Sequence, residues 1–399
     1  MNISSLICEL DPLHRGHKYL LDAIRRDGAD CIIACMSGSF TQRGEPALFD
    51  KYTRAGAALL CGADLVIELP VTFACAGAER FAYGGIYILD ALGIADRLYF
   101  GSECGDLSMI KKAALAAEDD RVSAEIKRLM KTGITFAAAR EKSVRSVYGD
   151  ETADILKTPN NILGAEYIKA LTRLESSIEP HTLRREGAAH DSRDIAHGFV
   201  SATYLRELFI SGGDISPFIP ERAAELFAGY DDAPAGMSRM EVLRRAMLAR
   251  LRTMTPQELS QLPDVSEGLE NRLYKAIRSE CSVEGILNAA KTKRFTMARL
   301  KRTLMHAFLG MTAELCALPP QYIRILGFNT AGREALRRIK KTCSLPVIST
   351  PSKLPPLSEE GRRLFGFECL CDDLYALSGR TISPCGENVR RGAEEMNNE

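Results

Sequence analysis

Apolar and polar positions along the first hundred residues follow two alternating patterns. Short, continuously apolar runs bounded by turn residues predict buried strands, and segments with apolar residues every three or four positions predict helices. The strands are expected at 2–10, 30–37, 64–70 and 95–103, and the helices at 14–28, 50–63 and 78–93. Strands that are apolar throughout and alternate with helices indicate a parallel sheet covered on both faces. The expected fold class is therefore α/β, with a Rossmann-like, doubly wound parallel sheet.

Three polar segments follow predicted strands at the same end of this sheet. They are ELDPLHRGH (9–17), MSGSFTQRGEPA (36–47) and FGSECG (100–105). Open α/β sheets bind their ligands beyond the carboxyl ends of the strands. We therefore expect these three segments to meet around a ligand.

The rest of the chain changes character several times. Residues 111–149 are mostly amphipathic helix, and 214–310 look almost wholly helical. Short strand and helix patterns return at 320–350 and precede a polar tail. A chain of 399 residues is long enough for more than one domain. The expected division is a catalytic domain at 1–210, a mainly helical α+β region at 211–385 and a disordered tail at 386–399.

Charge and cysteine content restrict the function classes. Lys+Arg and Asp+Glu each number 52, so nucleic-acid binding would have to come from a local basic cluster. No apolar run has the length of a membrane span and no leader pattern is visible, so a cytoplasmic protein without membrane contact is expected. Cys31 and Cys35 lie in a predicted strand, where reduced thiols pack as small hydrophobic groups. Cys369, Cys371 and Cys385 lack the second spaced pair of a zinc site, so no protein metal site is expected.

His14 and His17 stand in the first turn of a predicted helix. Their spacing places both imidazoles on one face, beside unpaired backbone N–H groups and the positive end of the helix dipole, where anions bind. Gly16 between them lets a ligand approach the backbone. Two imidazoles there can stabilise a phosphate group under attack without a covalent intermediate. We predict that both histidines are catalytic; the alternative is a surface pair that only caps the helix.

A second element, SATYLR at 201–206, lies at another junction of loop and helix. Ser201 or Thr203 can cap the helix, while its free N–H groups and Arg206 bind a phosphate group. Neither a P-loop nor a Gly-x-Gly-x-x-Gly turn occurs, which argues against a P-loop enzyme and a dinucleotide cofactor. Alone, SATYLR is an ordinary helix cap; together with the histidines it predicts the opposite side of a triphosphate site.

These motifs resemble the adenylyl-transferring superfamily that includes the class I aminoacyl-tRNA synthetases. Within it, ELDPLHRGH is similar to the pattern Glu-Tyr-Asn-Pro-Phe-His-Asn-Gly-His of the bacterial tRNA(Met) cytidine acetate ligase family. The further matches follow in order over most of the chain: MSGSFTQRGEPALFDKYTRA, VIELP, FGSE, NNILGAEYIKAL, SATYLR, EGLENRL and TKRFTMARLKR.

The resemblance implies a reaction in two steps. Acetate attacks the α-phosphate of ATP to give acetyl-adenylate and pyrophosphate, with Mg²⁺ expected alongside ATP. The exocyclic amine of the wobble cytidine of elongator tRNA(Met) then takes the acetyl group, and AMP leaves. The implied partners are tRNA and acetate, and no protein partner is implied.

By position, the resemblance also implies which residues contact ATP. Gly101 would lie near the nucleotide, where a side chain would obstruct it, and either Asn160 or Asn161 would be a further contact. Arg185 is chosen because the arginine of the family stands three residues after its threonine, here Thr182. The full expected ATP set is Ile7, Cys8, Glu9, Leu10, Asp11, Pro12, Leu13, His14, Arg15, Gly16, His17, Lys18, Tyr19, Leu20, Gly101, Asn160, Asn161, Arg185, Ser201, Thr203 and Arg206.

RNA contacts are expected from local basic clusters. The segment KTKRFTMARLKR (291–302) contains no acid, and on a helix several of its cations would project together toward phosphates. In the loop 36–47, Arg43 is a candidate phosphate or RNA contact that Glu45 could hold in place. A second basic run lies at 333–341, and for every run the alternative is a solvated face. The expected RNA-binding residues are Arg43, Lys291, Lys293, Arg294, Arg299, Lys301 and Arg302.

The chain departs from the family pattern at four positions: Leu10, Asp11, Leu13 and Arg15 stand for Tyr, Asn, Phe and Asn. Asp11 would bring negative charge close to a triphosphate and would need a metal or an arginine such as Arg15 nearby. Leu13 would remove a ring that could wall the acyl pocket, which leaves a larger carboxylate open as the acid. Two rival functions follow: a small-molecule adenylyltransferase, which would not need the helical region, and a non-catalytic tRNA-binding relative.

Overall fold

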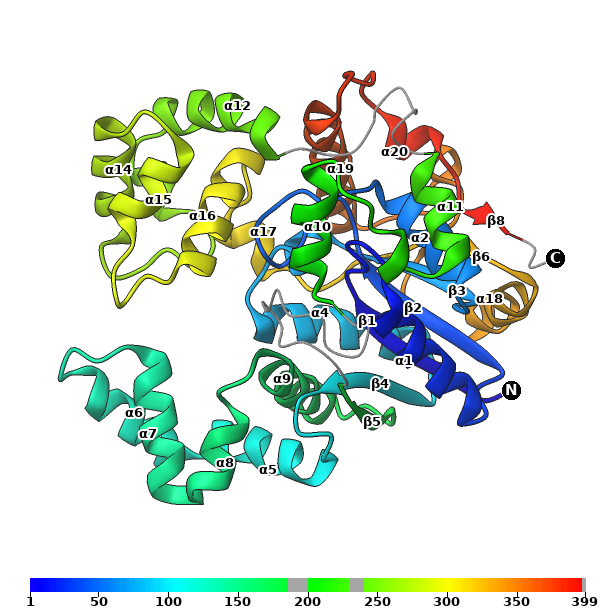
Figure 1. Ribbon diagram of the computed structural model, residues 1–399, viewed down its shortest axis with the longest axis horizontal. Helices are drawn as coiled ribbons and strands as arrows, with labels where there is room; N and C mark the ends of the chain where they lie inside the picture. The colour runs from blue at the N-terminus through cyan, green and yellow to red at the C-terminus, as the bar shows by residue number, and fades with distance from the viewer. Residues whose placement is uncertain (186–199, 230–239, 397–399) are drawn as a thin grey trace.

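A single eight-stranded sheet organises the computed structural model, which describes residues 1–185, 200–229 and 240–396 (Figure 1). The strand order is β5-β4-β1-β2-β3-β6-β7, and β8 pairs with β6. The first five strands are parallel, and β6 is antiparallel to β3. The strands are β1 (Ile3–Cys8), β2 (Cys31–Ser37), β3 (Leu65–Leu69), β4 (Arg97–Ser102), β5 (Glu179–Arg184), β6 (Ile323–Phe328), β7 (Val347–Ile348) and β8 (Glu394–Glu395). The sheet is mixed but mostly parallel, which confirms the predicted fold class.

Helices cover both faces of the sheet, which explains why its central strands are apolar throughout. Neighbouring residues of β2 point into different cores: Ile33 packs in a core that includes residues of α4 and α9, and Ile32 in one that includes residues of α1, α2 and α11. Cys31 and Cys35 are fully buried in the first core, as predicted. The covering helices are α1 (Arg15–Arg26), α2 (Lys51–Leu60), α3 (Val71–Ala74), α4 (Ala78–Ala91), α9 (Pro159–Arg173), α10 (Ala202–Ile210), α11 (Glu221–Ala228) and α18 (Thr330–Thr342).

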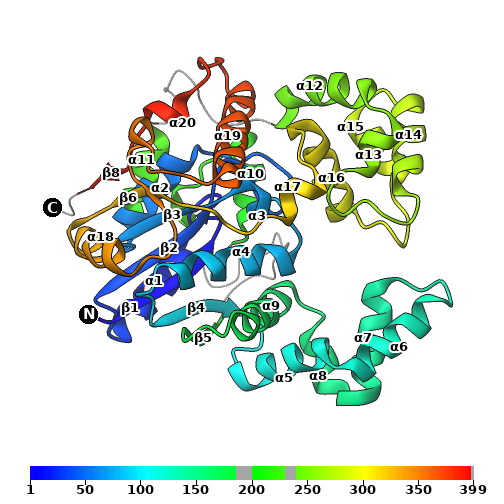
Figure 2. The same cartoon turned by 180° about the vertical axis from the view of Figure 1, so that it is seen from behind.

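Two helical lobes project from the sheet toward the same side, one above the other in Figure 1 and again in the reverse view of Figure 2. The first is inserted between β4 and α9 and contains α5 (Leu107–Glu118), α6 (Asp120–Met130), α7 (Phe136–Tyr148) and α8 (Asp150–Ile155). The second contains α12 (Met240–Thr253), α13 (Pro256–Ser260), α14 (Leu269–Ser279), α15 (Val283–Ala290), α16 (Met297–Leu309) and α17 (Ala313–Ala317). The helices expected at 111–149 and 214–310 are therefore present.

The C-terminal part of the chain does not extend the helical region. The strand β6 lies between β3 and β7, and its apolar residues Ile323, Ile325 and Leu326 are fully buried. It is followed by α19 (Glu359–Tyr375), α20 (Glu387–Arg390) and β8. The predicted boundaries at 211–385 and 386–399 therefore differ from the structure. The apolar pattern identified β6 as a strand, but it could not show that its partner is β3, more than 250 residues earlier in the chain.

The strand β5 was not predicted as a strand. It lies at the edge of the sheet beside β4, where none of its side chains is fully covered, so it lacks the continuous apolar run of the central strands. Within the described ranges, no helix combines the length and the apolar character needed to cross a bilayer.

Candidate functional site

A cavity lies beyond the carboxyl ends of β1, β4 and β5, beside the first turns of α1 and α10; we call it the strand-end cavity. All three segments predicted to meet there contribute to its lining: the first with its histidines, the second with Gln42 and Arg43, and the third with Gly101. The predicted site residues that line it are Ile7, Cys8, Glu9, Leu10, Asp11, His14, Gly16, His17, Tyr19, Leu20, Arg43, Gly101, Asn160, Arg185, Ser201 and Arg206.

The rings of His14 and His17 are fixed by hydrogen bonds from backbone N–H groups at the start of α1. The Nδ1 atom of His14 accepts a hydrogen bond from the N–H of Gly16 (3.1 Å), and Nδ1 of His17 accepts one from the N–H of His14 (3.2 Å). The rings stack with their centroids 3.8 Å apart. Because both Nδ1 atoms accept, each neutral ring carries its proton on Nε2, which is the nitrogen left to donate to a ligand.

Both histidines are neutral at physiological pH. Burial lowers the pKa of His14 to about 3, and the charge of Arg185 adds to this effect. Burial also lowers the pKa of His17 well below its usual range, with contributions from His14 and Arg185. The pair therefore offers two neutral N–H donors at the positive end of α1, which suits a triphosphate without requiring buried imidazolium ions. His14 is only 7% exposed and so is not a surface residue as that alternative requires, although the same hydrogen bonds do cap α1.

The carboxylate of Asp11 contacts groups of the protein itself. One carboxylate oxygen accepts a hydrogen bond from the N–H of Leu48 (2.7 Å), and the other lies 3.5 Å from Nη1 of Arg206. The same guanidinium nitrogen donates to the carbonyl oxygen of Asp11 at 2.7 Å. The arginine that compensates Asp11 is therefore Arg206 and not Arg15, whose side chain is exposed outside the lining.

The SATYLR element meets the histidine element through this contact. Ser201 is the N-cap of α10, and its hydroxyl accepts a hydrogen bond from the N–H of Tyr204 at 3.1 Å. Arg206 also donates to the hydroxyl of Thr203 at 3.4 Å. The first turns of α1 and α10 thus face one cavity, with Arg206 joining them.

The other end of the cavity is formed by β4, β5 and the start of α9. Nη1 of Arg185 donates to the side-chain oxygen of Asn160 at 3.1 Å. A Cβ atom on Gly101 would lie 3.0 Å from Cγ of Arg185, so the glycine leaves space beside that arginine. Asn161 instead accepts hydrogen bonds from the N–H groups of Glu103 and Cys104 and is 3% exposed. Of the two asparagines, Asn160 is the one that lines the cavity.

This difference leads to a prediction for the two asparagines. Asn160→Ala is expected to raise the KM for ATP about tenfold while stability changes little, because its side chain faces the cavity. Asn161→Ala is expected to lower the free energy of unfolding by about 1–3 kcal/mol, because it leaves two backbone N–H groups without their acceptor. Urea unfolding and ATP titrations of both variants measure the two effects; equal losses of affinity and stability in both would contradict the assignment.

The remaining predicted residues lie outside the lining. Leu13 is fully buried in the core below the cavity, so it forms no wall of an acyl pocket. Lys18 pairs with Asp22 on the surface of α1. The complete set of predicted ATP residues outside the lining is Pro12, Leu13, Arg15, Lys18, Asn161 and Thr203.

Arg54 was missed by sequence reasoning although it supports the site. It is fully buried and donates to the carbonyl oxygens of Glu9 (2.7 Å), Ser37 (3.0 Å) and Phe49 (2.9 Å), and also to that of Gly38. It therefore fixes the ends of β1 and β2 below the cavity. The only available signal was an arginine directly before the apolar run 55–61 of the helix predicted at 50–63.

Most of the basic segment at 291–302 is engaged with the protein itself. Residues 291–296 precede α16 and are not helical, so the cations do not project from one helix as predicted. Lys301 pairs with Glu45 at 2.6 Å, and Arg299 donates to the carbonyl oxygen of Asp264 at 2.6 Å. Arg302 approaches the carbonyl oxygen of Gln42 at 3.5 Å, and Arg294 lies 3.7 Å from Glu267. Lys291 and Lys293, like Arg294, remain exposed.

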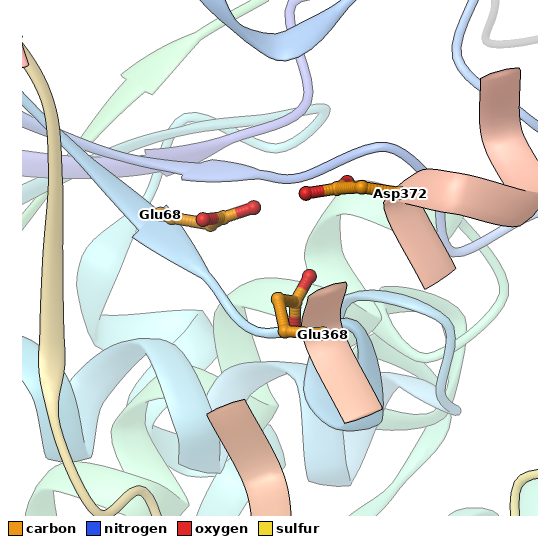
Figure 3. Close-up of side chains that lie close together, drawn as sticks. All are labelled: Glu68, Glu368 and Asp372. Carbon is orange, nitrogen blue, oxygen red and sulfur yellow. The ribbon is translucent and has the colours of Figure 1, made fainter. Parts of the chain in front are cut away.

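Three carboxylates converge in a separate buried cluster (Figure 3). Glu68 from β3 faces Glu368 and Asp372 from α19, and within the described part of the chain this is the one group of three such side chains close enough to share a cation. The ammonium group of Lys51 supplies that positive charge: it lies 2.7 Å from both Glu68 and Asp372. Cys371 is fully buried on α19 as a free thiol. The cluster lies outside the strand-end cavity.

Comparisons with known proteins agree on one family. The model of the HIGH Nucleotidyl Transferase family matches residues 1–387. The tRNA(Met) cytidine acetate ligase of Thermoanaerobacter sp. (strain X514) is 38% identical over 394 residues, covering 97% of this chain and 98% of that protein. The one of Caldicellulosiruptor saccharolyticus is 40% identical over 348 residues, covering 86% of each.

Solved structures give the same result. Apo Thermotoga maritima TmcAL is 30% identical, superimposes with a TM-score of 0.94, and each chain is covered completely. The same protein bound with alpha-thio ATP superimposes with a TM-score of 0.92, again at 30% identity over both complete chains.

Proposed function

Since the chain belongs to the HIGH nucleotidyl transferase family and, within it, to the tRNA(Met) cytidine acetate ligases, we propose that it acetylates the wobble cytidine of elongator tRNA(Met) at the expense of ATP. It would be a ligase that forms a carbon–nitrogen bond. The first step joins acetate to the α-phosphate of ATP and releases pyrophosphate. The second transfers the acetyl group to the exocyclic amine of the cytidine and releases AMP.

The observation that supports this proposal most strongly is the pair of neutral imidazoles at the start of α1. Their Nε2–H groups can donate to phosphate oxygens that gain charge as acetate attacks, and neither ring needs to change protonation. Arg206 and the first turn of α10 would bind the phosphates from the opposite side. A nucleotide would bind at the β4–β5 end, where Asn160 and Gly101 line the cavity. The alpha-thio ATP bound by the Thermotoga maritima protein supports nucleotide binding by this fold.

Mg²⁺ would accompany ATP. It binds mainly through phosphate oxygens and water, with at most one or two carboxylates from the protein. The cavity fits this mode, because among the described residues its lining contains no group of three clustered carboxylate, histidine or cysteine ligands. When bound, the ion neutralises charge on the leaving pyrophosphate.

Acetate is the acid that the names of the relatives give, and we propose it here. The argument for a larger carboxylate depended on Leu13, whose side chain is in the core instead of the cavity wall. For tRNA, we propose that the exposed Lys291, Lys293 and Arg294 contact phosphates, with Arg43 at the cavity itself. The cations that are already paired, Arg299, Lys301 and Arg302, would then position the lobe more than they bind RNA.

Exchange of labelled pyrophosphate into ATP tests the first step, and acetyl transfer to a tRNA(Met) transcript tests the second. We expect exchange that requires acetate, and transfer that is lost when the wobble cytidine is replaced by uridine. Exchange that requires a different carboxylate instead of acetate would identify that carboxylate as the acid substrate. A small-molecule adenylyltransferase would show pyrophosphate exchange that does not require acetate, and no acetyl transfer to tRNA. Tight tRNA binding without any exchange would indicate a non-catalytic relative.

A further inference from the structure

The strand-end cavity has a second end, away from Gly101 and Asn160. There it is lined by Glu9, which follows β1, and by Gln42 and Arg43, which follow β2. The carboxylate of Glu9 is oriented by the loop: its Oε1 accepts a hydrogen bond from the N–H of Gln42 at 2.7 Å. A carboxylate is thus held at the wall of a cavity whose other polar groups are mainly donors suited to an anion.

This second end adjoins the helical lobe. Glu45 of the same loop pairs with Lys301 of α16, and the carbonyl oxygen of Gln42 faces Arg302. The contact is close at Gly44, where a Cβ atom would lie 2.7 Å from the backbone nitrogen of Arg302. An RNA bound along the exposed cations that precede α16 would therefore reach the cavity at the end where Glu9 lies.

The surroundings of Glu9 favour a proton acceptor. Burial raises the pKa of its carboxyl group, and the charge of Asp11 adds to this rise, whereas the Gln42 hydrogen bond and the guanidinium groups of Arg43 and Arg206 oppose it. The thiols of Cys8 and Cys75 and the phenol of Tyr167 lie near enough to interact electrostatically with Glu9, and burial favours their neutral forms by raising their pKa values. A carboxylate in this setting is a stronger base than one in water.

We propose that Glu9 binds the exocyclic amine of the target cytidine and removes its proton during acetyl transfer. This inference rests on the proposed function and assigns a residue to its second step. A carboxylate accepts a hydrogen bond from the exocyclic amine of cytosine, and it would repel the carbonyl oxygen that uracil carries at the same position.

The step balances without a further reactant. The nitrogen of the amine attacks the carbonyl carbon of acetyl-adenylate and forms the new carbon–nitrogen bond. The bond from that carbon to the phosphate oxygen breaks, and its electron pair leaves with AMP. The proton lost by the nitrogen moves to the Glu9 carboxylate and then to solvent. The adenylation step involves no such proton, so the role proposed for Glu9 belongs to the second step only.

The test compares both steps in Glu9→Gln, which keeps the shape of the side chain and can still accept from the N–H of Gln42. Because Glu9 lines the cavity expected to hold ATP, the test compares two losses: single-turnover acetyl transfer to tRNA(Met) should be slower by about 10²–10⁴-fold, and the loss of acetate-dependent pyrophosphate exchange should be smaller by at least about tenfold. Hydroxylamine, which needs no base from the enzyme, should trap acetyl-adenylate as fast as Glu9→Gln forms it. Glu118→Gln, on the exposed surface of α5, is the matched control and should change neither step.

The pH dependence supplies a readout that a purely structural role would not give. Transfer by the parent should slow as pH falls through the raised pKa of Glu9, whereas the residual transfer by Glu9→Gln should lack that decline. Transfer at the parent rate in Glu9→Gln would overturn the proposal, as would equal loss of exchange and transfer, which would place Glu9 in the ATP site. A parent chain that shows no acetate-dependent exchange would instead overturn the proposed function, and this inference with it.

Discussion

Replacing both His14 and His17 by alanine is expected to slow acetate-dependent pyrophosphate exchange by at least about 10³-fold, because each removed donor to a charged transition state typically costs 10²–10³-fold. The Nδ1 atoms are occupied by the backbone of α1, so the Nε2–H groups are the donors that the substitution removes. Exchange of labelled pyrophosphate at saturating ATP measures the effect. Exchange within tenfold of the parent would show that the pair is only a helix cap.

A second variant separates the capping role of His14 from its predicted catalytic role. Asparagine can accept from the backbone N–H groups of the first turn as His14 does, but it has no donor at the Nε2 position. His14→Asn is therefore expected to keep the free energy of unfolding within about 1 kcal/mol of the parent while exchange is lost. His181→Ala, on β5 and outside the cavity lining, is the control that should leave exchange unchanged.

The protonation state of the pair also has a consequence for the pH profile. Since burial lowers the pKa of His14 to about 3 and that of His17 well below its usual value of 6.5, neither ring should titrate in the range around pH 6.5. The adenylation rate should therefore show no histidine ionisation in this range. A decline that follows an imidazolium near pH 6.5 would mean that a charged histidine contributes.

The features that the sequence predicts well are those that depend on residues close together in the chain. The histidine cap is such a case: every hydrogen bond that fixes the two rings joins residues at most three positions apart. The central strands were predicted for a similar reason, because burial on both faces leaves a continuous apolar run in each. The edge strand β5 has no such run and was missed.

The contacts that complete the site join distant positions and could not be predicted. Arg206 compensates Asp11 across 195 residues, so Asp11 looked like an uncompensated departure from the family pattern. Lys301 pairs with Glu45 across 256 residues, so the basic segment looked free of acids. Periodicity shows which face of an element is buried, but it does not show which charged side chain lies opposite once the chain has folded.

The buried cluster around Lys51 is held by the same kind of distant contact, and removing its one cation should be costly. Lys51 contacts Asp372, which lies 321 residues later in the chain. The Lys51 side chain is only 3% exposed, so water does not replace its carboxylate partners. Burial favours the neutral amine, but the charges of Asp372 and Glu68 raise the pKa of Lys51, which stays protonated. The ammonium group therefore joins α2, β3 and α19 below the loop that lines the cavity.

Glu368 has a different role within the cluster. Burial and the neighbouring Glu68 raise its pKa well above the usual range, which favours the protonated acid. Its Oε2 accepts from the N–H of Val71 at 2.9 Å, and its Oε1 has no other partner among the described residues, which suits a proton shared with Glu68. The folded state thus holds a proton that the unfolded chain releases near pH 4, and stability falls as pH rises above that value toward the raised pKa.

Lys51→Met is therefore expected to lower the free energy of unfolding by about 3–5 kcal/mol, because it leaves Glu68 and Asp372 buried without their countercharge. Glu368→Gln should be close to neutral, since glutamine can accept from Val71 and donate to Glu68 as the protonated acid does, and relative to the parent it should gain stability as pH rises. Lys157→Met, which removes an exposed pair with Asp154, should cost less than about 1 kcal/mol. Urea unfolding of the three variants between pH 5 and 8 measures these differences. A gain of stability in Glu368→Gln that is the same at pH 5 and at pH 8 would mean that Glu368 is ionised throughout and that Lys51 balances three charges instead of two.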